Sequence, residues 1–177
     1  MQHTVTQFEA EIGTAEYLKD YVDVDYFLSC CKACQNYGHV WACPPYDFDP
    51  CDLWRKYDRL HVYGYQVRYS GERTQKEMEE VLWQVKERLD EEMLRLETET
   101  PGSLALSAGS CKRCRTCSRP EGKPCRFPQW MRHSIESIGG DVGKTIEQLC
   151  GIEIQWAKEG SLPEYYVVAG GLLTKDR

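Results

Sequence analysis

The sequence has no uninterrupted apolar stretch of about 20 residues, the length that an α-helix needs to cross a bilayer. Its first residues, MQHTVTQFEAEIG, have neither the basic start nor the apolar core of a secretory signal. It also has no internal repeat of fixed period and no low-complexity linker. These absences disfavour a membrane protein, an exported protein and a repeat array, and we expect a cytoplasmic protein.

A net positive charge is missing as well, because the chain carries a net charge of −6. That charge is unevenly distributed: residues 111–133 carry +6 and the rest of the chain carries −12. The basic side chains of this segment are Lys112, Arg113, Arg115, Arg119, Lys123, Arg126 and Arg132. The acidic remainder would repel a polyanion, so we do not expect nucleic acid as a partner.

The chain is long enough for one sizeable hydrophobic core, and we expect a single domain over residues 1–177. An apolar fraction of 41% with 11 Tyr and 5 Trp is typical of a packed protein rather than a disordered one. The oligomeric state stays open at this point.

Local patterns predict both helices and strands. A capping box at Thr74 and Glu77 begins a long amphipathic helix that Pro101-Gly102 ends. The other predicted helices are residues 14–28, a short helix closed by Gly139-Gly140, and residues 142–149, capped by Asp141. The predicted strands are residues 60–69, 103–108, 152–156 and 164–173, the last two joined as a hairpin by a turn at 158–163. We therefore expect an α+β fold, with a small mixed or antiparallel sheet covered by the long helix and with cysteine-rich metal-binding loops.

Ten cysteines are the most distinctive feature of the composition. In a reducing compartment, clustered thiols indicate metal ligands or redox groups rather than structural disulfides. The even count would also suit the disulfide framework of an exported protein, but the export signal that this reading needs is missing.

Four of these cysteines lie within fifteen residues, in the segment CKRCRTCSRPEGKPC. Cys111, Cys114 and Cys117 have the spacing by which a loop supplies three corners of an iron–sulfur cluster, and Cys125 would supply the fourth. Zinc is the alternative, although zinc sites usually obtain four crowded sulfurs from two separated CxxC knuckles. We name these four residues the quartet, and we expect it to hold a [4Fe–4S] cluster, with zinc as the rival.

A second segment contains Cys31, Cys34 and Cys43, which we name the trio, followed by two prolines that force an extended path. The trio gives three thiol ligands, so a fourth ligand would be Cys30, Cys51, His39 or a group from outside the chain. An open corner would permit a substrate-binding iron, whereas a closed second site or one cluster shared by both segments would be structural.

The two segments CKACQNYGHVWACPPYDF and CKRCRTCSRPEGKPCRFPQWMRHSIESIGGDVGKT closely resemble a bacterial and archaeal family of predicted metal-binding proteins, domain of unknown function 2284. The resemblance covers residues 30–175. It rests on the CxxC, the Cys-Pro-Pro, the quartet, and a Ser-x-Glu-x-x-Gly formed by Ser134, Glu136 and Gly139. One position departs, since His133 stands where a proline is expected before the serine. The resemblance implies a metal and names no reaction.

The basic residues around the quartet have two readings. Arg126 and Arg132 could bind an anionic ligand or cofactor near a helix start, or they could offset the negative charge of thiolate-bound metal. Ser134 and Glu136 are explained by helix capping. We expect an electron-transfer protein whose basic face docks an acidic partner of the ferredoxin or flavodoxin type. An enzyme with an open iron site and a zinc-stapled binding module are the alternatives.

Overall fold

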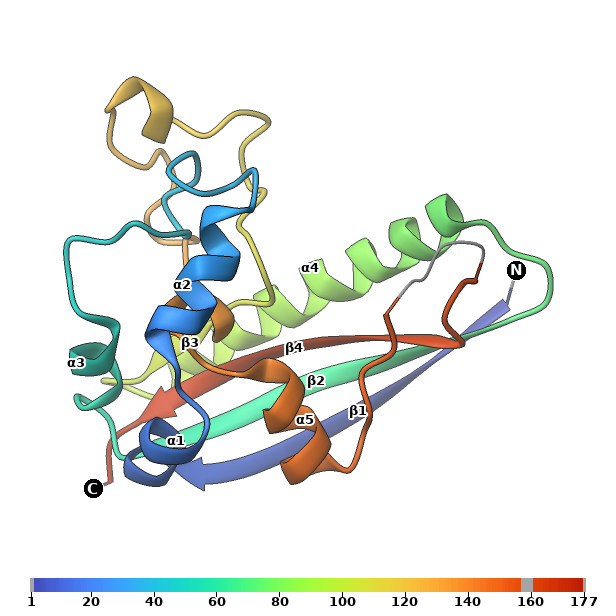
Figure 1. Ribbon diagram of the computed structural model, residues 1–177, viewed down its shortest axis with the longest axis horizontal. Coiled ribbons are helices and arrows are strands. Elements are labelled where there is room, and N and C mark those ends of the chain that lie inside the picture. Colours follow the sequence, from blue (N-terminus) through green and yellow to red (C-terminus); the bar gives the residue numbers. More distant parts are fainter. Residues whose placement is uncertain (1, 157–160, 177) are drawn as a thin grey trace.

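A four-stranded antiparallel sheet forms the centre of the computed structural model, which describes residues 2–156 and 161–176. The strands are β1 (Gln2–Gly13), β2 (Arg59–Ser70), β3 (Leu104–Leu106) and β4 (Tyr165–Thr174), in the order β1-β2-β4-β3 (Figure 1). β1 and β2 pair along their whole lengths, from Gln2 opposite Ser70 to Gly13 opposite Arg59. The short β3 pairs only with the end of β4.

The helix α4 (Gln75–Glu99) lies across one face of the sheet (Figure 1). Thr74 accepts the backbone N–H of Glu77 and the Glu77 carboxylate accepts the backbone N–H of Thr74, so the predicted capping box is present. The buried residues of α4 are Met78, Val85, Leu89 and Met93. They pack against Tyr65, Val67, Tyr69 and Val168 of the sheet, as the alternation of side chains along β2 and β4 requires. The predicted long helix and its apolar face are confirmed.

Several short helices cover the opposite face. They are α1 (Thr14–Asp20), α3 (Pro50–Trp54), the 3₁₀ turn η2 (Glu136–Ile138) and α5 (Val142–Cys150). The helix α2 (Val24–Lys32) contacts η2 and has no buried residue. Trp54 and Tyr17 are fully buried here, with ring centroids 4.9 Å apart. The Trp54 indole donates to the Ile138 carbonyl over 2.9 Å, and the Tyr17 hydroxyl lies 2.7 Å from that of Thr145. Aromatic packing therefore joins α1 to α3, and hydrogen bonds join these two helices to η2 and α5.

The predicted helix at 14–28 is two helices, because Tyr21 closes α1 and Asp23 caps α2. The strand β1 was not predicted, although Phe8, Ala10 and Ile12 alternate with two glutamates before α1. The alternation is confined to the second half of β1. The first half is exposed on both faces, so its residues do not show the alternation of apolar and polar side chains that a covered strand has.

The predicted strand at 152–156 is wrong. This segment is irregular, and its terminal Trp156 is 75% exposed, so the alternation of apolar residues buries no face. Side chains hold the segment in place: Tyr165 donates to the Glu153 carbonyl, and Gln155 accepts the backbone N–H of Glu164. Part of the turn expected at 158–163 lies outside the described residues. The strand expected at 164–173 is confirmed as β4, and the strand expected at 103–108 is confirmed as the shorter β3.

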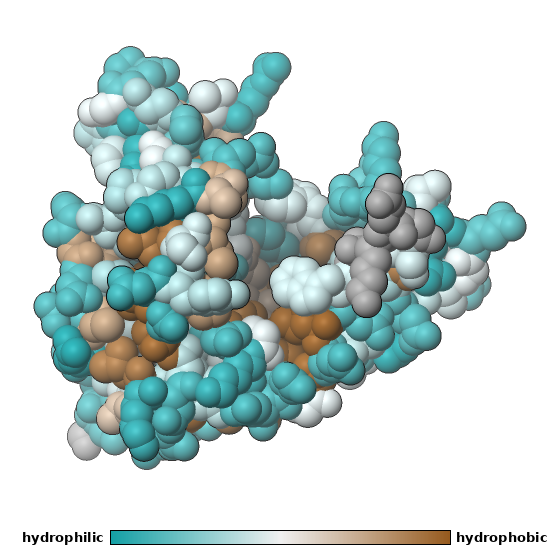
Figure 2. Space-filling view, in the orientation of Figure 1, coloured by the Kyte–Doolittle hydropathy of each residue, from teal (hydrophilic) through white to brown (hydrophobic). Residues whose placement is uncertain are grey.

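Both cysteine segments lie at the same end of the molecule, near β3 and the C-terminal end of α2 (Figure 1). The space-filling view shows that they form a projection covered mainly by hydrophilic residues (Figure 2). None of the helices in the described part of the chain has both the length and the apolar character needed to span a membrane.

Candidate metal centre

The quartet lies in a long loop that leaves the sheet after β3 and returns beside its starting point. The backbone N–H of Ser107 donates to the His133 carbonyl over 2.9 Å, and Ser107 forms a β-bridge with Ser134. The Ser107 hydroxyl also donates to the Arg132 carbonyl over 3.1 Å. The base of the loop is therefore fixed to the sheet at both of its ends.

All four cysteines of the quartet line one small pocket inside this loop. The other lining residues are Val40, Trp41, Ala42, Arg113, Phe127 and Met131. The four cysteines are half-buried. The volume of the pocket is about 20 Å³, which is close to the space that one water molecule occupies.

The seven-residue gap between Cys117 and Cys125 is folded back on itself. The turn η1 (Arg119–Glu121) ends at Gly122, whose φ of 66° is in the left-handed region that favours glycine. The buried Ser118 accepts the backbone N–H of Lys123 at its carbonyl and donates its hydroxyl to the Pro124 carbonyl over 2.7 Å. This turn returns the chain, so Cys125 faces the same pocket as the three earlier cysteines.

Several neighbouring groups act on the pKa of the Cys111 thiol. Burial raises the pKa of Cys111, while the backbone N–H of Arg113 acts in the opposite direction. The thiols of Cys125 and Cys114 add to the upward shift of this pKa, because like charges nearby disfavour the thiolate. A bound cation would reverse this effect, because metal ligation stabilises the thiolate form.

The trio is gathered around the C-terminal end of α2. Burial, reinforced by the neighbouring thiols Cys43 and Cys34, raises the pKa of Cys31 to about 11. The Cys43 thiol donates to the Ser110 hydroxyl over 3.4 Å, which places the trio directly beside the residue that precedes Cys111. The two groups of cysteines are thus adjacent in space although about 70 residues apart in sequence.

Arg119 fastens the two cysteine segments together. Its guanidinium group donates to the carbonyls of Val40, Cys43 and Pro45, with a distance of 2.8 Å to the Val40 oxygen. It also lies over the ring of Trp41, 5.2 Å from the centroid. Because a guanidinium presents several donors in a fixed plane, one side chain can bind several carbonyls of a tight turn.

Trp41 forms a contact in the other direction, from the trio segment to the quartet loop. Its indole N–H donates to the Lys123 carbonyl over 3.0 Å, and its side chain lines the pocket of the quartet. Each segment therefore contributes a wall to the site of the other.

No set of three or more Cys, His, Asp and Glu side chains within residues 2–156 and 161–176 is grouped so that it could hold a single metal ion. The thiols of the quartet share one pocket without converging on a single point.

The structure also places His39 and the three remaining cysteines. His39 Nδ1 donates to the Tyr37 carbonyl over 2.7 Å. Cys51 lies at the start of α3, and Cys150 is the last residue of α5. Cys30 is exposed on α2 beside Cys31.

The two arginines considered as anion ligands make contacts within the protein. Arg132 forms an ion pair with Glu97 of α4, with a distance of 2.9 Å from Nε to Oε1 and side-chain exposures of 18% and 16%. Arg126 donates to the Thr116 carbonyl over 2.7 Å and so stabilises the quartet loop. The charge of Arg132 is therefore balanced by α4.

The family model of predicted metal-binding proteins, domain of unknown function 2284, matches residues 19–173. The chain belongs to this family. The matched range contains both cysteine segments, β2, β3 and nearly all of β4, whereas β1 lies outside it. No curated protein and no solved structure matches the chain. Family membership makes this a predicted metal-binding protein with ten cysteines, and it names neither the metal nor a reaction.

A buried carboxyl in the family's Ser-x-Glu-x-x-Gly segment was not recognised as part of the site. Glu136 is half-buried as a residue, but burial of its carboxyl group raises its pKa, against the hydrogen bond of Ser134 and the charge of Lys86. A Cβ placed on Gly109 would lie 3.9 Å from Glu136 Oε1, so this carboxyl group is next to the base of the quartet loop. It also contributes to the raised pKa of Cys31 and Cys43. Only the tertiary structure brings it there.

Replacing Glu136 by Gln is expected to stabilise the protein at neutral and higher pH. The pKa of Glu136 is raised in the folded state, so the folded protein binds more protons than the unfolded chain, and stability falls as pH rises through that interval. The amide of Gln cannot titrate and removes this loss. Thermal unfolding measured from about pH 5 to about pH 8.5 should show the two proteins converging at low pH and separating at high pH. Glu16→Gln on the exposed side of α1 is the control, and parallel curves for Glu136→Gln and the parent would contradict the prediction.

Proposed function

We propose that this protein is a cytoplasmic iron–sulfur protein that transfers electrons, with a [4Fe–4S] cluster bound by Cys111, Cys114, Cys117 and Cys125. The observation that carries the proposal is that four thiols of one loop line one pocket. Thiolates are the usual ligands of such clusters, which supply one-electron redox chemistry when bound.

Two features of the site bear on the choice of metal. A single zinc ion binds its sulfurs at about 2.3 Å, so four zinc ligands crowd around one point. The described thiols share a pocket but are not grouped closely enough for one ion. The pocket volume of about 20 Å³ favours zinc, because a four-iron cube needs more space. The quartet loop consists mainly of irregular chain, so rotation of its half-buried cysteines would widen the pocket.

The residues around the pocket have roles that follow from their chemistry. Trp41, Phe127 and Met131 would exclude water and oxygen from the cluster, which affects its reduction potential. The basic side chains of residues 111–133 would partly balance the charge of a thiolate-bound cluster and attract an acidic redox partner of the ferredoxin or flavodoxin type. Phe127 and Trp130, 39% and 38% exposed, would give such a partner apolar contacts within the basic surface.

The test is purification without oxygen, followed by metal and sulfide analysis. We expect a brown protein with iron and sulfide in equal amounts and a broad absorbance near about 400 nm that bleaches with dithionite. A colourless protein with stoichiometric zinc would refute the iron–sulfur assignment and support a zinc-stapled module. In that case, retention on heparin that weakens steeply with salt would indicate nucleic-acid binding.

An enzyme with an open iron site is the second candidate, and the trio carries it. Three adjacent thiols have the buried carboxyl group of Glu136 nearby, and the only neighbouring cysteine among the described residues that act on Cys31, beyond the trio, is the exposed Cys30. If the trio binds an iron with an open coordination position, cyanide should change the absorbance and electron paramagnetic resonance spectra of the protein. Unchanged spectra would favour the electron carrier.

A further inference from the structure

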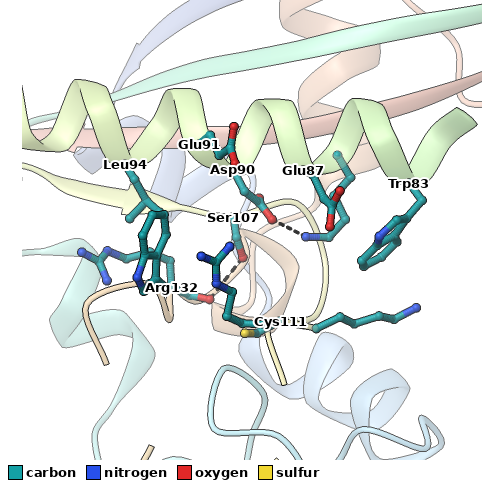
Figure 3. A pocket seen from close by; sticks show the side chains of 12 residues that line it. Trp83, Glu87, Asp90, Glu91, Leu94, Ser107, Cys111 and Arg132 are labelled. Atoms are coloured by element: carbon teal, nitrogen blue, oxygen red, sulfur yellow. Dashed lines mark hydrogen bonds and ion pairs between the residues drawn. The ribbon is translucent and has the colours of Figure 1, made fainter. Parts of the chain in front are cut away.

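A second and larger pocket lies between α4 and the start of the quartet loop (Figure 3). Its volume is about 160 Å³, and we call it the α4 pocket. Its lining residues from α4 are Trp83, Lys86, Glu87, Asp90, Glu91 and Leu94, and those from the facing loop are Ser107, Cys111, Lys112, Arg113, Trp130 and Arg132. Neither the packing of α4 on the sheet nor the proposed cluster at the quartet accounts for this pocket.

The α4 pocket shares a wall with the pocket of the quartet. Cys111 and Arg113 line both spaces, so a molecule in the α4 pocket would lie against one of the cysteines that we propose as cluster ligands. In Figure 3, Cys111 faces the row of acidic side chains on α4 across the pocket.

Part of the charge in the α4 pocket is balanced internally. Lys86 pairs with Asp90, and the side chains are only 12% and 27% exposed. Asp90 also accepts the backbone N–H of Ala108 over 3.1 Å. Arg132 is paired with Glu97, as described above. These ion pairs leave little free charge for a ligand.

The other four charged residues lie on facing walls. On the loop, the Lys112 ammonium lies 4.4 Å from the centroid of Trp83, and the Arg113 guanidinium lies 4.1 Å from that of Trp130. Contact with an aromatic face positions a cation without neutralising it. On α4, Glu87 and Glu91 are exposed. Across the described parts of the chain, none of these four side chains takes part in an ion pair within 4.0 Å.

We propose that the α4 pocket binds a small zwitterionic amino acid, with its carboxylate toward Lys112 and Arg113 and its ammonium group toward Glu87 and Glu91. Lys112 reaches across to Trp83 of α4, so unpaired charges of both signs lie along this pocket and match a ligand that carries both charges. A cavity of about 150 Å³ accommodates benzene, so a ligand of roughly six to ten non-hydrogen atoms fits. Leu94 and the two indoles favour a small apolar side chain. The inference goes beyond the proposed function, because these walls bind the ligand whichever metal the quartet holds.

The experiment uses the full chain as purified without oxygen. Each of the protein amino acids is added at low-millimolar concentration, and binding is followed by tryptophan fluorescence and calorimetry, because Trp83 and Trp130 line the site. Leucine, 4-methylpentanoate and 3-methylbutylamine form a matched series that carries both charges, only the carboxylate and only the ammonium group. We expect a small apolar amino acid to bind, and leucine to bind at least about fivefold more tightly than either analogue, as one added ion pair allows.

Variants assign each end of the ligand to a wall. Glu91→Gln should weaken leucine binding by roughly fivefold and leave 4-methylpentanoate unaffected, and Lys112→Gln should weaken both acids and leave the amine unaffected. Glu79→Gln makes the same change on α4 outside the pocket and should have no effect. Binding of no amino acid, or equal binding of leucine and a singly charged analogue, would overturn the proposal. Because metal content is measured separately, neither result depends on whether the metal is iron or zinc.

Discussion

Replacing any one of Cys111, Cys114, Cys117 and Cys125 by Ala is expected to remove most of the metal and to lower the melting temperature by similar amounts. All four line one pocket, so the loss of any thiol opens the same centre to water and oxygen. The free energy that metal binding adds to folding is lost with the metal. Iron and sulfide content, absorbance and thermal unfolding of the four variants, all purified without oxygen, measure the effect.

Cys150→Ala is the matched control, because Cys150 ends α5 and is separate from both cysteine groups. It should keep its metal and lose about 1 kcal/mol of stability at most, the usual cost of a small side chain. Full metal retention in Cys125→Ala together with loss of the metal in Cys43→Ala would contradict the assignment of ligands. The two segments would then share one site.

Variants of the trio decide how many centres there are. If the trio binds a separate metal, replacing Cys31, Cys34 or Cys43 by Ala should leave the metal of the quartet in place. The contact between Cys43 and Ser110 makes a shared centre the alternative, and loss of the same metal in both series would establish it.

Arg119→Lys is also expected to destabilise the protein strongly, although the substitution conserves the positive charge. The guanidinium of Arg119 donates to three carbonyls of the trio segment, and an ammonium group on a flexible stem cannot reach them all at once. Hydrogen bonds from a charged donor contribute about 1.5–3 kcal/mol, so we expect a loss of roughly 2–3 kcal/mol in chemical denaturation.

Metal analysis should show the same variant losing metal more readily to a chelator, because Trp41 would no longer be held over the pocket of the quartet. Arg115→Lys provides the control, since Arg115 is an exposed residue of the same loop. Equal stability and equal metal retention in the two variants would show that Arg119 does not fasten the segments.

The long helix and the central strands could be predicted because local signals determine them. The Thr74 capping box, the apolar stripe of α4 and the stop at Pro101-Gly102 lie within one short stretch of sequence. The alternation of apolar residues at 152–156 failed as a signal, because it gave no information on whether a partner strand was free to receive it.

Only the local part of the candidate site could be predicted from the sequence. The spacing of Cys111, Cys114 and Cys117 is local, and it indicated a metal loop without any structure. The contacts of Arg119 with Val40 and of Trp41 with Lys123 join residues about 80 positions apart, and the placement of Glu136 depends on the whole sheet. Such contacts leave no periodic trace in a sequence, so only the structure reveals that the two segments interlock.

The hydrogen bond between Ser107 and His133 makes the quartet loop a closed ring of chain attached to the sheet at one point. A metal bound by four of its residues would divide that ring into several smaller rings and restrict its conformations. Loop-closure entropy changes slowly with length, by about 0.6 kcal/mol for each doubling. Without the metal, the smaller rings would no longer exist and the loop would gain conformational freedom. The sheet would keep its own core of buried residues. If the proposed cluster is lost by oxidation, we expect a local change that leaves the scaffold folded and able to bind metal again.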